Sequence, residues 1–290
     1  MTTYHLVIQA GDIETGDLKT LHALAGANGI EQISGNFSHQ AFRLLDVDIE
    51  ASARVQAHCE QARLDFGFVP AGAALTDFGL IAMDMDSTLI TIECIDEIAD
   101  YAGKKSAVAA VTAAAMRGEI DWPASLRQRV ATLAGLHEDN LQRVYTERLK
   151  LSPGAGQLIA AAKDANIRLL LVSGGFTFFT NKLKARLGID YAFSNILEIV
   201  DGVLTGRVVG PLCDAFAKAE HMRNTASLLA LRADQVLVIG DGANDLPMMA
   251  AAGTSIAYQA KPVVRAQANH ALNHVGLDAV LALFPASGRR

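Results

Sequence analysis

Cysteine is scarce in this sequence. Its 290 residues include only Cys59, Cys94 and Cys213, which are far apart and contain no CxxC pair. An odd number of widely spaced cysteines is not typical of a disulfide framework or of a structural zinc site. We therefore expect reduced, mostly buried thiols in a cytoplasmic protein.

Long hydrophobic runs are also missing. The most apolar segments, such as 169–172 and 236–239, are much shorter than the roughly 20 residues that a membrane-spanning helix needs. The opening residues, MTTYHLVIQAGD, lack the basic region and apolar stretch of a signal peptide. We expect a protein that has no membrane partner.

Positive charge is limited too. Lys and Arg number 25 against 31 Asp and Glu, the net charge is −6, and no Lys/Arg cluster is present. This composition argues against nucleic acid as a partner, but one local basic site is enough to bind a small phosphorylated molecule. Because 51% of the residues are hydrophobic, the chain has enough apolar side chains for a large buried core.

Residues 1–77 have the pattern of a small α+β domain. Their periodicities follow the order β-α-β-β-α-β, which is the ferredoxin-like arrangement. The expected strands and helices cover residues 5–10, 16–27, 30–34, 40–47, 50–63 and 65–69. The segment PAGAA at 70–74 then predicts a linker.

Residues 78–290 predict an α/β domain with a Rossmann-like parallel sheet. Short apolar strands alternate with helical patterns, which places helices on the faces of the sheet. The strands are expected at 80–83, 168–172, 236–239 and 254–258. A long Ala-rich helical stretch separates the first two strands and is too long for one crossover. We expect about residues 101–150 to form a helical cap over the sheet edge.

Polar residues follow three of these strands. Asp84 and Asp86 come after the first strand, Ser-Gly-Gly at 173–175 after the second, and Asp241 after the third. Because the carboxyl ends of parallel strands meet at one edge of a sheet, these residues are expected to converge there. Two acids at such an edge can hold a divalent cation, or one can attack while the other moves protons. Each residue alone also has an ordinary use in a turn or helix cap.

The segment GDGAND at 240–245 is the strongest partner of the first acid pair. Asp241 offers a further carboxylate, and a set of carboxylates at two strand ends is typical of a Mg²⁺ site. Asn244 and Asp245 precede a helix that begins near Pro247. Asp245 therefore has the alternative role of a helix N-cap.

Three other charged residues allow two interpretations each. Lys218 lies near the start of an expected helix, Glu93 heads another, and Arg129 lies in the expected cap. Alone, a helical Lys or Arg is usually a solvated charge, and an acid at a helix start interacts favourably with the helix dipole. None of the eight histidines is assigned to metal binding or catalysis.

Taken together, these motifs resemble those of a known superfamily. DMDST at 84–88, VSGGF at 172–176, Lys218 and GDGAND at 240–245 are similar, in order, to the four motifs of the haloacid dehalogenase superfamily. A finer resemblance, over about residues 78–285, is to the phosphoserine phosphatases. It rests on the segments DSTLITIE at 86–93, IDEIA at 95–99, SLRQRV at 125–130 and DYAF at 190–193.

The resemblance implies a Mg²⁺-dependent phosphatase that works through an aspartyl-phosphate. It assigns Asp84 as the nucleophile and Asp86 as the general acid and base. The Mg²⁺ ligands would be the Asp84 carboxylate, the backbone carbonyl of Asp86, and Asp241.

The resemblance also implies a set of phosphoryl-binding residues. Ser173, Gly174 and Lys218 would bind the phosphoryl oxygens, and Asn244 would donate to substrate or phosphate. Asp245 would orient Lys218 or the waters of the metal.

The implied substrate is O-phospho-L-serine, hydrolysed to serine and phosphate in the last step of serine biosynthesis. Glu93 would bind its ammonium group and Arg129 its carboxylate, with Arg127 as the rival for the second role. Met116 and Trp122 match apolar cap residues that would exclude water when the cap closes.

Other readings stay open at this point. The substrate is alternatively another small phosphomonoester, such as phosphohomoserine or a sugar phosphate. A chiefly sensory protein is a further alternative, in which 1–77 would bind an amino acid and the remainder would be a degenerate scaffold. In strand order, the first 77 residues resemble ACT-type regulatory domains, which suggests a homodimer formed through this domain.

Overall fold

A single sheet runs through the whole computed structural model, which describes residues 2–286 except for the side chain of Met116. The strand order is β2-β3-β1-β4-β11-β10-β9-β5-β6-β7-β8. The strands are β1 Tyr4–Ala10, β2 Gly29–Gln32, β3 Gln40–Val47, β4 Asp65–Pro70, β5 Leu80–Met83, β6 Arg168–Phe176, β7 Tyr191–Val200, β8 Val203–Val209, β9 Val236–Gly240, β10 Thr254–Tyr258 and β11 His270–Leu272.

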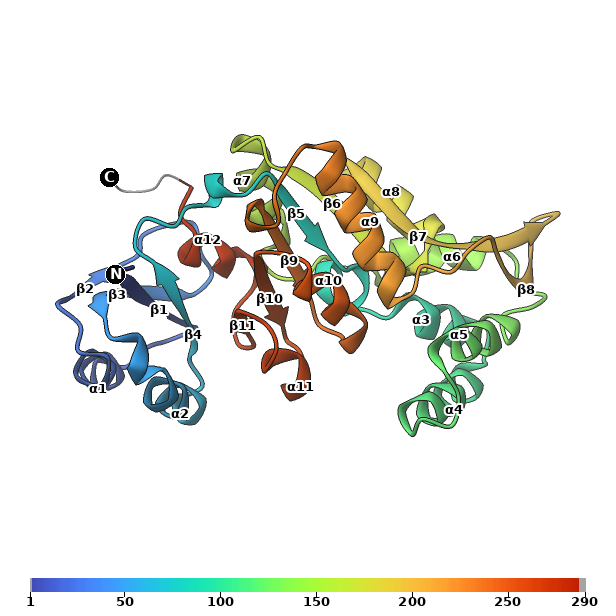
Figure 1. Cartoon of the computed structure of the whole chain (residues 1–290). Helices are drawn as coiled ribbons and strands as arrows, with labels where there is room; N and C mark the ends of the chain where they lie inside the picture. The colour runs from blue at the N-terminus through green and yellow to red at the C-terminus, as the bar shows by residue number, and fades with distance from the viewer. Residues whose placement is uncertain (1, 287–290) are drawn as a thin grey trace.

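Helices cover this sheet and extend beyond one of its edges (Figure 1). The α-helices are α1 Thr15–Ala25, α2 Ser52–Ala62, α3 Cys94–Tyr101, α4 Lys105–Met116, α5 Trp122–Ala131, α6 Asp139–Arg143, α7 Ala155–Asp164, α8 Thr177–Leu187, α9 Ala215–Leu228, α10 Leu246–Ala250, α11 Pro262–Arg265 and α12 Val280–Leu283. Within residues 2–286, none of these helices combines the length and the apolar character that crossing a bilayer requires.

The first part of the chain has the expected β-α-β-β-α-β order. Strands β1–β4 pair antiparallel, and α1 and α2 lie together on one face of their sheet (Figure 1). Apolar side chains that alternate along β1, such as Leu6 and Ile8, form a separate core with Val55 and Cys59 of α2. This alternation is what places one face of a strand against helices.

The second part contains the expected parallel sheet. Strands β10, β9, β5, β6 and β7 pair parallel in that order. Alternate residues of β5 enter different cores, because successive side chains point to opposite faces. Ile81 and Met83 belong to the core that includes Phe179 of α8, whereas Leu80 and Ala82 belong to the core that includes Met222 of α9. Both faces are thus buried, as a parallel sheet requires.

Besides strand β11, two features of this sheet are absent from the sequence-based prediction. The first is the antiparallel β7–β8 hairpin, which turns at Asp201 and Gly202, both with positive φ. The second is the extent of β6, which continues to Phe176, so that residues 173–175 lie inside a strand and not after one. A register shift allows this extension, because Phe176 pairs with Asn195 of β7 beyond the irregular segment.

Strand β11 joins the two parts of the sheet. It pairs parallel with β10 and antiparallel with β4 through Ala271 and Phe66. Beside this contact, the buried carboxylate of Asp65 accepts hydrogen bonds from the backbone N–H groups of residues 273–275, at 2.7–3.1 Å. The amino-terminal part is therefore fastened to the parallel sheet by backbone pairing and by the hydrogen bonds to the buried Asp65 side chain.

Helices α3–α6 lie between β5 and β6 in the chain, and α3, α4 and α5 lie beyond one end of the parallel strands (Figure 1). The chain leaves and re-enters the sheet through two segments that pair with each other. Ile90 and Leu151 form an isolated antiparallel bridge, and the N–H of Thr91 donates to the carbonyl of Lys150 at 3.0 Å. This paired base places the helical insertion over the carboxyl ends of the strands.

Candidate active site

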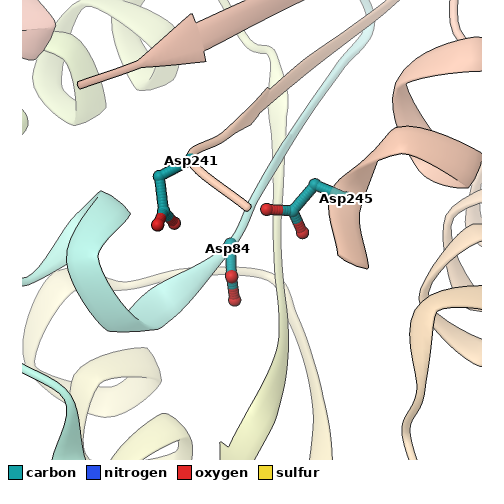
Figure 2. Close-up of side chains that lie close together, drawn as sticks. All are labelled: Asp84, Asp241 and Asp245. Atoms are coloured by element: carbon teal, nitrogen blue, oxygen red, sulfur yellow. The ribbon is translucent and has the colours of Figure 1, made fainter. Parts of the chain in front are cut away.

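The predicted strand ends converge on one cavity. It has a volume of about 450 Å³ and lies between the carboxyl edge of the parallel sheet and the helical insertion. Predicted site residues from the sheet and from the helical insertion line this cavity. They are Asp84, Asp86, Glu93, Trp122, Arg129, Ser173, Gly174, Asp241 and Asn244. The carboxylates of Asp84, Asp241 and Asp245 lie close together there, from two segments that are far apart in the chain, one after β5 and one after β9 (Figure 2).

A buried lysine lies between two of these carboxylates. Lys218 of α9 is 0% exposed, and its Nζ is 2.9 Å from Asp84 Oδ2 and 2.9 Å from Asp245 Oδ1. Helix α9 begins directly before it, where Asp214 caps the N–H groups of Phe216 and Ala217. The predicted contact between Lys218 and Asp245 is therefore present in the structure.

Opposite charges keep this lysine protonated. Burial alone would lower the pKa of Lys218, but the carboxylates of Asp245 and Asp84 outweigh burial and raise it. Burial raises the pKa of Asp84 well above its usual range, and the nearby cation of Lys218 acts in the opposite direction. A second cation next to Asp84 would favour its ionised form further.

Asp86 has a proton affinity suited to acid–base chemistry near neutral pH. Burial, followed by the negative charge of Glu93, raises its pKa to about 7. The N–H of Cys94 donates to Asp86 Oδ1 at 3.2 Å. A Cβ at Gly175 would lie 2.7 Å from Asp86 Oδ2, so only glycine leaves room for this carboxyl group.

The carboxylates fit a hard divalent cation. One oxygen each of Asp84, Asp241 and Asp245 lies within 4.8 Å of the others, which is an all-oxygen donor set. Asp245 already accepts from Lys218 and from the N–H of Gly242, at 2.9 and 3.1 Å. Burial raises the pKa of Asp241 to about 6, so a cation there would stabilise its ionised form.

Charges of both signs lie on the cavity wall nearest the helical insertion. Glu93 is the residue before α3, and Arg129 belongs to α5. Arg129 Nε is buried and has no hydrogen-bond partner among the described residues, which leaves it ready for a ligand. Arg127, its rival in the sequence, is exposed and does not line the cavity. Of the two arginines, Arg129 is therefore the one that lines the cavity.

The predicted apolar cap residues have different outcomes. Trp122 lines the cavity, and its ring would be 3.0 Å from a Cβ at Gly174. Met116 ends helix α4, and its side chain lies outside the described part of the structure.

Sequence reasoning missed three groups that hold the acids in place. Ser87 Oγ donates to Glu93 Oε1 at 2.7 Å, and Thr88 Oγ1 donates to Asp241 Oδ1 at 2.8 Å. The third is the backbone N–H of Cys94, described above. Ser87 and Thr88 belong to the DMDST motif, but no contact was predicted for their hydroxyls, although hydroxyls directly after an acid pair are natural partners for carboxylates.

This fold and site define a class of protein. A family model described as haloacid dehalogenase-like hydrolase matches residues 78–253, and a model of a domain of unknown function (DUF4072) matches residues 6–54. Because the first match covers more than half of the chain, the protein belongs to the haloacid dehalogenase-like hydrolases.

The relatives narrow this class to phosphoserine phosphatases. The phosphoserine phosphatase of Polaromonas sp. (strain JS666) is 56% identical over 214 residues, which cover 72% of this chain and 91% of that protein. The solved structure of a HAD family hydrolase from Salmonella enterica is similar over 97% of this chain and 98% of that one, with a TM-score of 0.87 and 33% identity. A probable phosphoserine phosphatase from Vibrio cholerae has a TM-score of 0.82 and 36% identity, covering 97% of this chain and 86% of its own.

Replacing the buried lysine should destabilise the fold. We expect Lys218→Met to lower the free energy of unfolding by about 3–5 kcal/mol in metal-free buffer, because two buried carboxylates lose their cation. Urea denaturation followed by circular dichroism measures this change. The exposed Lys19→Met is the matched control and should change stability by less than about 0.5 kcal/mol. Equal stability of the two variants would contradict the buried ion-pair arrangement.

Proposed function

We propose that the protein hydrolyses O-phospho-L-serine to L-serine and phosphate, with the cavity residues in the roles described below. One observation carries the proposal. A single cavity is lined by Asp84, which is paired with the buried Lys218 and suited to phosphoryl transfer, and also by Glu93 and Arg129. A phosphorylated amino acid carries the matching groups, since its phosphate, ammonium and carboxylate require a cation, an acid and a guanidinium.

The reaction proceeds in two displacements. An Asp84 oxygen attacks phosphorus, the bond between phosphorus and the seryl oxygen breaks, and Asp86 gives its proton to that oxygen. Water then attacks the aspartyl-phosphate and transfers a proton to Asp86, which releases phosphate and regenerates Asp84. A pKa of about 7 suits Asp86 to both steps, because each protonation state is well populated near neutral pH.

Mg²⁺ is the cofactor we propose for this site. The carboxylates of Asp84 and Asp241 and the backbone carbonyl of Asp86 would hold it, and bound there it neutralises charge as an anionic carboxylate approaches an anionic phosphate. Asp245 is the third acid of the cluster, but its contacts with Lys218 and Gly242 favour a positioning role for it.

The remaining cavity residues bind the phosphoryl group. Ser173, Gly174 and Asn244 line the cavity together with Asp84, and the buried Lys218 lies 2.9 Å from the Asp84 carboxylate. The hydroxyl of Ser173 accepts the N–H of Gly175 at 2.9 Å, which orients it. Donors fixed in this way stabilise the charge of the transferring group without reorganisation.

The helical insertion provides selectivity and excludes water. Glu93 binds the substrate ammonium and Arg129 its carboxylate, while Trp122 supplies apolar surface to the cavity. Because Arg129 comes from the insertion and Asp84 from the sheet, a substrate that contacts both also holds the insertion in place.

The amino-terminal part is proposed as an ACT-like regulatory domain spanning residues 1–77, followed by the phosphatase domain at 78–290 with its cap at about 101–150. Its antiparallel sheet and paired helices support this assignment. We further propose that the enzyme acts in the cytoplasm, in the last step of serine biosynthesis, and forms a homodimer through this domain.

The substrate assignment is tested by phosphate release. With Mg²⁺ present, we expect O-phospho-L-serine to be hydrolysed with a higher kcat/KM than phosphohomoserine, a sugar phosphate or an aryl phosphate. Asp84→Asn, which preserves size but removes the nucleophile, should reduce release to the level of the blank. A preference for another phosphomonoester would contradict the assignment of phosphoserine as the substrate. Full activity of Asp84→Asn would contradict the assignment of Asp84 as the nucleophile.

Arg129 is tested by comparing substrates that differ in one group. We expect Arg129→Ala to raise KM for phosphoserine by about 10- to 100-fold, because a hydrogen-bonded pair of charges is lost. KM for phosphoethanolamine, which lacks the carboxylate, should change little. The exposed Arg127→Ala should leave both values unchanged. Equal effects of Arg129→Ala on the two esters would remove Arg129 from the carboxylate role.

A further inference from the structure

The two hydroxyl residues directly after the acid pair point to different parts of the active site. We propose that Ser87 and Thr88 are positioning residues with separate tasks: Ser87 orients the acid that binds the substrate ammonium, and Thr88 orients a metal-binding acid. The first half of this inference rests on the proposed function, because it needs Glu93 to bind an ammonium group. The second half needs only a cation between Asp84 and Asp241.

Ser87 adopts an unusual backbone conformation to make its contact. Its φ is +57°, in the left-handed region that side chains other than glycine, asparagine and aspartate rarely occupy. In this conformation its Oγ donates to Glu93 Oε1 at 2.7 Å, and its N–H donates to the carbonyl of Ile92 at 3.2 Å. Strained residues of this kind persist where surrounding contacts hold them, commonly at functional sites. Glycine would fit this backbone better but would lack the hydroxyl.

The contact matters because Glu93 must be ionised to bind an ammonium group. Burial raises the pKa of Glu93, and the hydrogen bond from Ser87 acts in the opposite direction. Ser87 thus fixes the position of one carboxylate oxygen and favours its charge.

The same segment also connects Glu93 to the acid–base residue. Asp86 directly precedes Ser87, and Cys94 directly follows Glu93. The N–H of Cys94 donates to Asp86 Oδ1 at 3.2 Å. Two hydrogen bonds therefore fasten residues 86–87 to residues 93–94. A substrate ammonium held by Glu93 is placed at a fixed distance from the proton donor Asp86.

Thr88 makes its contact across the sheet edge. It is 0% exposed, and its Oγ1 donates to Asp241 Oδ1 at 2.8 Å. This bond joins the turn after β5 to the turn after β9, which supply Asp84 and Asp241. One oxygen of Asp241 is thereby held by the hydroxyl, and the other is left for a cation. Partners that orient metal ligands in this way typically change metal affinity about 10–100-fold when removed.

Ser87 is tested with two variants and two substrates. Ser87→Ala keeps the side-chain restriction on the backbone, and Ser87→Gly relieves it, but both remove the hydroxyl. We expect both to raise KM for phosphoserine by about tenfold, with little change for the deamino analogue O-phospho-3-hydroxypropionate. A KM rise in only one variant would assign the effect to the backbone and overturn the proposal. An equal rise for both substrates would overturn it too.

Thr88 is tested by metal binding without substrate. Mg²⁺ affinity is measured by calorimetric titration and by the rise in unfolding temperature on adding Mg²⁺. We expect Thr88→Val, which keeps the shape, to weaken affinity about 10–100-fold, and Thr88→Ser to restore it to near the wild-type value. Unfolding temperatures in chelator show whether each variant is folded. Wild-type affinity in Thr88→Val, or equal weakness in Thr88→Ser, would overturn the proposal.

Each half of the proposal predicts an effect on one property only: Ser87 variants change KM and not metal affinity, and Thr88 variants change metal affinity and not the KM ratio. Ser87→Ala should bind Mg²⁺ like the wild type, and Thr88→Val at saturating Mg²⁺ should keep the wild-type ratio of KM values for the two substrates. A change in Mg²⁺ affinity in Ser87→Ala, or in the KM ratio in Thr88→Val, would show a general disturbance of the turn. It would contradict the proposal that the two residues have separate tasks. If the wild type shows no preference for phosphoserine, the proposed function fails, whereas the Thr88 result is still decided by metal titration.

Discussion

The active site depends on one buried ion-pair arrangement, in which the Lys218 ammonium lies 2.9 Å from both Asp84 and Asp245. Burying these charges is unfavourable unless all of them are paired, so the arrangement requires β5, α9 and the loop after β9 to occupy fixed positions. The same cation that makes the buried carboxylates tolerable also lies where an anionic phosphoryl group must be bound. Stability of the site and its chemistry therefore rest on the same contact.

The parallel sheet supplies the rigidity that this arrangement needs. Both faces of β5 and β9 are buried, so their carboxyl ends are held by backbone pairing and by apolar side chains of α8 and α9. The helical insertion is attached through the paired base at Ile90 and Leu151 and through residues 135–138, which pair with the β7–β8 hairpin, and it brings Arg129 from outside the sheet. In the proposed function, the rigid sheet supplies the residues for phosphoryl transfer and the helical insertion supplies Arg129 for substrate recognition.

Much of this could be predicted, because polar residues that follow several parallel strands converge at one edge of the sheet. The strands β5 and β9 and the acids after them follow from that pattern. Lys218 does not, since a helical lysine looks solvated until its carboxylate partners are placed in space. The β7–β8 hairpin was missed although Asp201-Gly202 is typical of a tight turn. The single backbone pair between β4 and β11 could not be predicted, because it depends on tertiary placement of a three-residue strand.

The central claim is that Asp84 carries the phosphoryl group during turnover. Its most direct test is rapid acid quenching of the enzyme during hydrolysis of phosphoserine labelled with ³²P, followed by peptide mapping. The account predicts an acid-stable, base-labile label on the peptide that contains Asp84, and no label in Asp84→Asn. Label on another peptide, or full turnover without any labelled protein, would contradict the covalent mechanism and the role given to the Asp84–Lys218 pair.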